Sequence, residues 1–123
     1  MSVKGIGIDA VDVERFRRTL ERTPTMRTRV FTDVELGQLA DRVDDTQGLA
    51  VRFAAREAVM KAMGLGLGAF GFHEVWVERA DSGAPHLRLS GRAQELAAER
   101  GITSWHLSLT HTDTVAIAYV VAE

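Results

Sequence analysis

The segment RFAAREAVMKAMG, residues 52–64, sets the strongest limit on the fold, because it has a helical pattern without a broad polar face. Alanine, valine, methionine and phenylalanine occupy most of its circumference, whereas a surface helix gathers its charges on one side. Glu57 and Lys61 fall among these small and apolar neighbours, and we expect both to be at least partly buried. A buried charge needs a partner, a metal or a ligand to offset its desolvation.

Two interpretations of this charged pair are open from the sequence. Glu57 precedes Lys61 by four residues, and such a pair stabilises an exposed helix by about 0.2–0.5 kcal/mol. In that case the pair is an ordinary salt bridge. Alternatively, the helix carries both charges into a working site.

Length and composition are typical of one globular domain spanning residues 1–123, with 46% hydrophobic residues and no cysteine. Without cysteine there are no disulfides, thiolate metal sites or cysteine nucleophiles, which fits a cytoplasmic protein. No apolar run approaches the length of a transmembrane helix, so we expect no membrane span. The N-terminal sequence MSVKGIGIDAVDV lacks the long apolar stretch of a signal peptide.

The charges are distributed unevenly along the chain. The net charge of −2 argues against a general nucleic-acid-binding protein. Residues 14–29 contain six arginines against two glutamates, and residues 33–45 contain five acids against one arginine. A basic patch on a mildly acidic protein favours a specific acidic partner, and its simpler interpretation is a solvated helix face.

The N-terminal third has a strand pattern followed by two helical patterns. In VKGIGID two sets of residues alternate, which predicts a strand that ends at Asp9. The glycines of this strand imply close approach of another backbone or a ligand. A helix capped by Asp12 follows, with an apolar face of Val13, Phe16 and Leu20 and an outer face of Arg15, Arg18 and Arg22. Thr32 and Glu35 have the spacing of a capping box, which predicts a helix with an apolar stripe extending to Val43.

The remaining pattern predicts an α+β fold. A helix is expected over residues 49–63 with Gly64 directly after its end, then a glycine-rich loop over residues 64–71. HEVWVER and PHLRLSG read as two strands, a helix follows Ser90, and TSWHLSLTH and TVAIAYVVAE read as two more strands. The expected element order is therefore β-ααα-ββ-α-ββ.

Two further residues are candidates for a site. Asp9, at the predicted strand end, suits Mg²⁺, which takes one or two carboxylates together with phosphate oxygens, but it is equally typical of a turn or a cap. His111 suits a base or a phosphate donor, or is a histidine in a turn. Ser108 lies too close to it in sequence to specify a hydrolase triad, and no phosphate-binding loop or dinucleotide motif is present.

Three stretches, GIGIDAVDV, RFAAREAVMKAMG and HLSLTH, resemble the holo-acyl-carrier-protein synthase family in order, spacing and total length. These are the short 4′-phosphopantetheinyl transferases. The resemblance implies their α+β fold, assembled as a homotrimer with sites between neighbouring chains. It also implies that the 4′-phosphopantetheine of coenzyme A is moved to a serine of apo acyl carrier protein, as in fatty acid biosynthesis, releasing adenosine 3′,5′-bisphosphate.

The resemblance also implies roles for residues of this chain. Asp9 and Glu57 match carboxylates that hold Mg²⁺ against the pyrophosphate of coenzyme A. Lys61 matches a lysine near the transferred phosphate, and Glu57, Lys61 or a metal-bound water is the base. The resemblance also implies residues that contact the nucleotide: Arg52, Gly64 with its loop, and Ser108 and His111 from the adjacent subunit. The acidic carrier protein would dock on Arg15, Arg18 and Arg22.

Other classes of function remain alternatives. One is a non-catalytic α+β module that binds an acidic partner through its arginine-rich helix. Another is a metal-dependent phosphohydrolase that uses the same carboxylates and releases phosphate from coenzyme A without a carrier protein.

Overall fold

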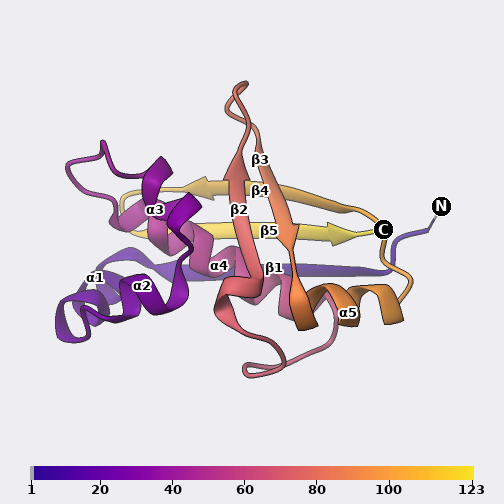
Figure 1. The fold of residues 1–123 in the computed structure, drawn as a ribbon. Coiled ribbons are helices and arrows are strands. Elements are labelled where there is room, and N and C mark those ends of the chain that lie inside the picture. Colours follow the sequence, from indigo (N-terminus) through magenta and orange to yellow (C-terminus); the bar gives the residue numbers. More distant parts are fainter. Residues whose placement is uncertain (1) are drawn as a thin grey trace.

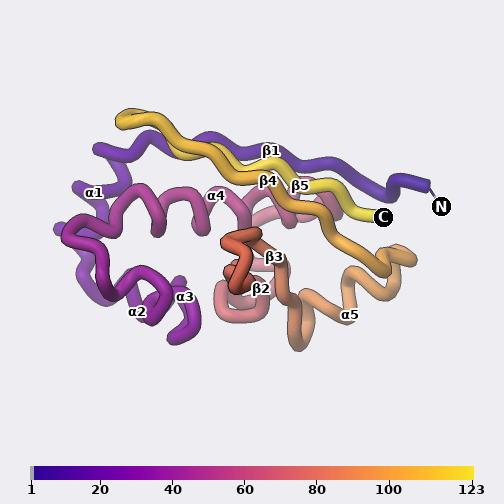
Figure 2. The backbone as a smooth tube through the Cα atoms, turned by 90° about the horizontal axis from the view of Figure 1, so that it is seen from above, coloured from indigo at the N-terminus to yellow at the C-terminus, as the bar shows by residue number. Residues whose placement is uncertain are grey.

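A computed structural model describes residues 2–123, and its central element is the helix α4 (Thr46–Ala62). Seen from above, α4 lies between a three-stranded sheet and the hairpin of β2 (Val75–Arg79) and β3 (Pro85–Leu89) (Figure 2). Thirteen of its seventeen residues are buried. The narrow strip that remains accessible carries Phe53, Glu57 and Lys61 at a spacing of four residues. The sequence pattern correctly predicted a helix with no broad polar face.

The described chain has the α+β architecture that the sequence predicts (Figure 1). In chain order the elements are β1 (Gly5–Asp12), α1 (Val13–Arg22), α2 (Met26–Val30), α3 (Asp33–Gln38), α4, the 3-10 helix η1 (Phe72–Glu74), β2 (Val75–Arg79), β3 (Pro85–Leu89), α5 (Gly91–Glu99), β4 (Trp105–His111) and β5 (Val115–Ala122). The expected order β-ααα-ββ-α-ββ therefore lacks one α-helix, and it also lacks η1, whose His73 and Glu74 were expected to begin a strand. The missing helix, α2, has five residues and follows Pro24, so it is too short to show a periodic pattern.

The larger sheet has the order β1-β5-β4 with antiparallel neighbours. One face packs on α4 through small side chains of β5 such as Ala116 and Ala118, which are fully buried. The opposite face is open. On it Ile8 of β1 lies opposite Tyr119 of β5, and both remain about half exposed at 55% and 43%.

Two glycines bring β1 into backbone contact with α4. A Cβ on Gly5 would lie 1.9 Å from the carbonyl oxygen of Ala62, and a Cβ on Gly7 would lie 1.8 Å from that of Ala58. No side chain fits at such distances, so only glycine allows the strand this close. The sequence predicted a close approach of a backbone or a ligand, and the structure shows a backbone.

The predicted strand end at Asp9 is wrong, because β1 continues to Asp12. The continuation follows from pairing, since Asp9 lies opposite Ala118 in the middle of β5 and Asp12 lies opposite Val115, its first residue. The prediction of Asp12 as the cap of α1 is confirmed, because its carboxylate accepts a hydrogen bond from the backbone N–H of Arg15 at 2.8 Å.

The predicted capping box at Thr32 and Glu35 is present at the start of α3. The helix ends at Gln38, however, and Val43 is fully exposed in the linker to α4 rather than part of an apolar stripe. Glu35 is also completely buried and pairs with the buried Arg56 of α4. A capping box gives no signal of such a long-range partner.

The C-terminal predictions are confirmed. Gly64 follows α4 with a positive φ of 69°, and residues 80–84 connect β2 to β3. Ser90 precedes α5, although its side chain forms no capping hydrogen bond. Across residues 2–123, no helix is both long enough and apolar enough to span a bilayer.

Candidate functional site

Asp9 faces α4 because it follows Gly5 and Gly7 in the alternation of β1. The close contact of strand and helix places it beside Lys61, whose Nζ lies 3.1 Å from the Asp9 carboxylate and donates to the carbonyl of Ile8 at 3.0 Å. Lys61 thus links α4 to β1. Its side chain is 55% exposed, so the prediction of partial burial is wrong for Lys61.

Glu57 does not pair with Lys61. Within residues 2–123 the carboxylate of Glu57 has neither a hydrogen-bond partner nor an ion pair, although the residue is half-buried. Burial raises the pKa of Glu57 and the nearby charge of Asp9 raises it further, while Lys61 opposes the rise. The interpretation of Glu57 and Lys61 as an ordinary helical salt bridge is therefore wrong.

Asp9 and Glu57 line one cavity of about 500 Å³ between β1, α1 and α4. Arg15 of α1 lies at the same cavity, whose remaining wall is largely apolar and includes Phe16 and Phe53. Asp12 lines the cavity too, but its carboxylate caps α1. The cavity therefore combines the carboxylates of Asp9 and Glu57 with this capping carboxylate, a guanidinium and an apolar surface.

The two carboxylates fit Mg²⁺ only if a substrate completes its coordination. Among residues 2–123 no group of three or more His, Cys, Asp or Glu side chains is arranged to hold a metal. Mg²⁺ is commonly bound by one or two carboxylates together with substrate phosphates and water, rather than by a complete protein cage. The half-buried, unpaired Glu57 facing Asp9 matches that partial donor set.

A second pocket, of about 200 Å³, is strongly basic. Arg52 of α4, Arg79 at the end of β2, His111 at the end of β4 and Arg42 from the linker between α3 and α4 line it. Arg52 is 1% exposed, and its Nε is buried without a hydrogen-bond partner. Its lining has four basic side chains and no carboxylate, so its chemistry suits an anion.

Electrostatics at this pocket agree with that assignment. Burial lowers the pKa of Arg52 to about 10, with smaller contributions from the positive charges of Arg79 and Arg42, although Glu35 opposes the shift. Arg52 thus stays protonated at neutral pH. Neither Arg42 nor Arg79 was a candidate from the sequence, because their pocket is formed by elements distant in the chain.

The two pockets open on different sides of α4. Glu57 follows Arg52 by five residues, which is about 140° around a helix of 3.6 residues per turn. In one chain the structure therefore groups Arg52 with His111, and Asp9 with Glu57 and Lys61.

Ser108 and Gly64 line neither pocket. Ser108 lies opposite Tyr119 on the open face of the sheet, whereas His111 reaches the basic pocket from the helix-facing side. Alternation along β4 separates the two residues that the sequence placed together. Gly64 donates its N–H to the carbonyl of Lys61 at 3.0 Å and is exposed at the end of α4.

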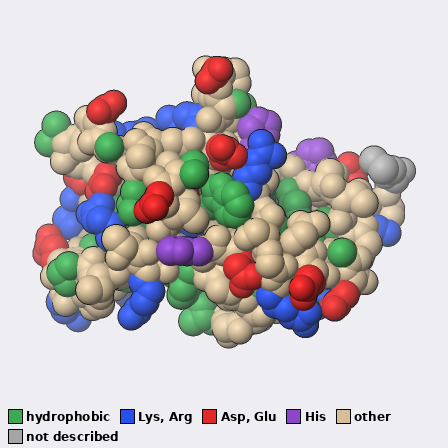
Figure 3. Space-filling view, in the orientation of Figure 1, with side chains coloured by type: hydrophobic (Ala, Val, Ile, Leu, Met, Phe, Trp, Pro, Cys, Tyr) green, Lys and Arg blue, Asp and Glu red, His purple; other side chains and the backbone are tan. Residues whose placement is uncertain are grey.

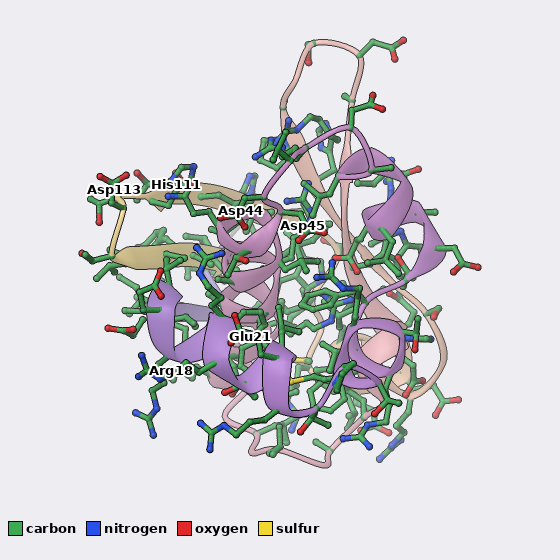
Figure 4. The ribbon with its side chains drawn as sticks, turned by 90° about the vertical axis from the view of Figure 1, so that its left-hand side faces the viewer. Arg18, Glu21, Asp44, Asp45, His111 and Asp113 are labelled. Carbon is green, nitrogen blue, oxygen red and sulfur yellow. The ribbon has the colours of Figure 1, made fainter. Side chains whose placement is uncertain are left out.

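The outer face of α1 carries the predicted arginines Arg15, Arg18 and Arg22, which are exposed and form no ion pair within residues 2–123. Lys and Arg side chains are visible over the lower left of the molecule, where α1 and α2 lie (Figure 3). In Figure 4, Arg18 points outward from α1. Because Arg15 also lines the carboxylate cavity, this basic face adjoins Asp9 and Glu57.

Comparisons with known proteins agree with this arrangement. Residues 5–120 match the 4′-phosphopantetheinyl transferase superfamily. The holo-[acyl-carrier-protein] synthase of Micrococcus luteus is 49% identical, over 98% of this chain and 92% of that protein. The synthase of the same name from Streptomyces avermitilis is 48% identical, over 100% of this chain and 99% of that protein.

Solved structures show the same fold. The holo-[acyl-carrier-protein] synthase of Neisseria meningitidis superimposes with a TM-score of 0.89 at 31% identity and covers 99% of both chains. The Helicobacter pylori synthase in complex with coenzyme A gives a TM-score of 0.80 at 28% identity, over 96% of this chain and 99% of that one. The chain therefore belongs to the 4′-phosphopantetheinyl transferase superfamily, and it is an enzyme of the phosphopantetheinyl transferase class.

Proposed function

We propose that this chain, as one domain, transfers the 4′-phosphopantetheine of coenzyme A to a serine of apo acyl carrier protein. The products are holo acyl carrier protein and adenosine 3′,5′-bisphosphate. The relatives named holo-[acyl-carrier-protein] synthase and the coenzyme A complex of one of them support this reaction. The observation that carries it here is the unpaired Glu57 facing Asp9 beside an exposed arginine helix.

Asp9 and Glu57 would hold Mg²⁺ together with the pyrophosphate of coenzyme A. Bound there, magnesium would offset the negative charge that develops on the departing phosphate. The ammonium group of Lys61 lies 3.1 Å from Asp9 and would add positive charge next to the transferred phosphate.

The basic pocket would bind the nucleotide phosphates of coenzyme A. The sequence predicted that Arg52 and His111 contact the nucleotide. Arg42 and Arg79 add two positive charges to the lining of the same pocket. Arg15, Arg18 and Arg22 would receive the acidic carrier protein next to Glu57.

We further propose a homotrimer. Ile6, Ile8 and Tyr119 leave an apolar strip on the open face of the sheet, with 58%, 55% and 43% of their surfaces exposed. A second copy of the chain is the occupant that explains this strip, because the carboxylate cavity and the basic pocket open on different sides of α4. One coenzyme A molecule would contact both if one subunit contributes the carboxylate cavity and its neighbour contributes the basic pocket.

Ile6→Lys is expected to convert the trimer into monomers and to lower transfer at least tenfold, because it places a charge in the apolar strip. Sedimentation equilibrium and a transfer assay measure the two effects. Val34→Lys is the matched control, since Val34 is 43% exposed on α3, away from the sheet. A monomeric Ile6→Lys variant with full activity would contradict sites shared between subunits.

Intact mass spectrometry of apo acyl carrier protein tests the function itself. The carrier is incubated with this protein, coenzyme A and Mg²⁺, and a parallel sample contains EDTA. We expect a mass gain of one phosphopantetheine group that EDTA suppresses. No gain on several carrier proteins, with folded trimeric protein, would favour the non-catalytic module. Phosphate release from coenzyme A without a carrier would favour the phosphohydrolase.

A further inference from the structure

The linker between α3 and α4 is tied to α1 and α2 by ion pairs. The guanidinium of Arg17 donates to Asp44 at 2.8 Å and to the hydroxyl of Thr46 at 3.0 Å. Arg27 of α2 forms an ion pair with Asp45. The acidic segment thus contacts both helices that contain the arginine-rich segment. We call Asp44 and Asp45, with Arg17 and Arg27, the strap.

The strap divides the arginines into two groups. Arg17 and Arg27 are held by carboxylates of the same chain, whereas Arg15, Arg18 and Arg22 of α1, and Arg29 of α2, have no ion pair within residues 2–123. Figure 4 shows Asp44 and Asp45 on one side of α1, with Arg18 pointing away from them. The two opposite charge runs of the sequence therefore neutralise each other only in part, and the free arginines lie on the outer face.

The strap ends at the helix that carries Glu57. Asp44 accepts a hydrogen bond from the N–H of Thr46, the first residue of α4, at 3.0 Å. The hydrogen bonds from Thr46 and Arg17 lower the pKa of Asp44 to about 2, so the carboxylate is ionised at neutral pH. The strap thereby fixes α1 and α2 relative to the first turn of α4 with charged hydrogen bonds.

We infer that Asp44 and Asp45 are positioning residues for the acyl carrier protein: they orient the free arginine face of α1 toward the cavity that holds Asp9 and Glu57. This inference rests on the proposed function. None of the four strap side chains lines the carboxylate cavity or the basic pocket. We therefore expect a larger effect on docking of the carrier than on binding of coenzyme A.

Replacing Asp44 and Asp45 has two opposite effects on the KM for the carrier, one through charge and one through the position of α1. Removing two negative charges beside a basic face strengthens the attraction of an acidic partner, and charge alone therefore lowers the KM for the carrier. Loss of the strap lets α1 move relative to Glu57 and raises that KM. The sign of the change decides between the two.

The test compares two double variants that remove the same charge. In Asp44→Asn/Asp45→Asn the strap is broken, and we expect the carrier KM to rise about three- to tenfold with kcat and the coenzyme A KM within about twofold of wild type. In the control, Asp33→Asn/Asp41→Asn, two exposed acids of the same region without an ion pair in the described chain are replaced. We expect its carrier KM to be unchanged or lower.

A charge exchange tests the geometry directly. Arg27 and Asp45 have only each other as side-chain partners within residues 2–123. Arg27→Glu and Asp45→Arg should each raise the carrier KM, and the combined variant, which restores the pair at unchanged net charge, should recover most of the loss. Circular dichroism confirms that each variant is folded, as expected because partly exposed ion pairs contribute only about 0–1 kcal/mol.

Different outcomes would contradict the positioning role of the strap and the proposed transfer reaction. A carrier KM that falls equally in both double variants, or an exchange variant no better than its single parents, would overturn the positioning role. A wild-type protein that transfers nothing to any carrier would instead overturn the proposed function.

Discussion

Glu57→Gln is expected to lower phosphopantetheine transfer by about 100-fold or more, because it removes one of two carboxylates available to Mg²⁺. The variant should fold at least as well as wild type. Burial and the charge of Asp9 already raise the pKa of Glu57, so the ionised carboxylate is under repulsion in the folded protein. Transfer measured by mass spectrometry and a thermal melt check the two expectations together.

Glu78→Gln is the matched control for this prediction. Glu78 lies on β2, where its exposed carboxylate pairs with Arg88 at 2.9 Å, away from both pockets. Its activity should equal that of wild type. Near-normal transfer by Glu57→Gln at saturating Mg²⁺ would exclude Glu57 as a metal ligand and weaken the assignment of the whole cavity.

Glu35→Ala is expected to lower the free energy of unfolding by about 3–5 kcal/mol, because it leaves a buried guanidinium without its counter-ion. Glu35 and Arg56 are both 0% exposed. Besides accepting from Arg56 at 2.9 Å, the carboxylate accepts the backbone N–H of Val77 at 3.0 Å and that of Thr32 at 3.0 Å. One side chain thus joins α3, α4 and β2, and urea denaturation measures its contribution.

Glu78→Ala provides the comparison for burial. It also removes a glutamate from an arginine, but the side chains of Glu78 and Arg88 are 42% and 55% exposed. Such a pair contributes about 0–1 kcal/mol. If the two alanine variants lose equal stability, the buried pair does not connect α3 to α4 as described.

Local patterns were sufficient for most of the fold. The cap at Asp12, the capping box at Thr32 and the end of α4 before Gly64 each depend on residues a few positions apart, and each prediction is confirmed. The absence of a polar face on α4 correctly indicated a largely buried helix. It also predicted that Glu57 is at least partly buried, which the structure confirms and which is half of the candidate site.

The other half depends on contacts between distant segments. The partner of Lys61 is Asp9, 52 residues away, and that of Arg56 is Glu35, 21 residues away. A helical wheel shows only the i,i+4 neighbour of Lys61, which is why the predicted salt-bridge alternative named the wrong acid. The grouping of Arg52 with His111 likewise required the structure. The trimer, the roles of individual residues and a cytoplasmic location stay predictions.

The contact of β1 with α4 limits how this protein can change over evolution. Its spacing is determined by main-chain atoms at Gly5, Gly7, Ala58 and Ala62, with no side chain between strand and helix at the two glycines. Core positions elsewhere, such as Phe70, can exchange one apolar side chain for another of similar volume at modest cost. The separation of Asp9 from Lys61 and Glu57 does not depend on those exchanges. The core sequence can therefore drift while the distances inside the cavity stay constant.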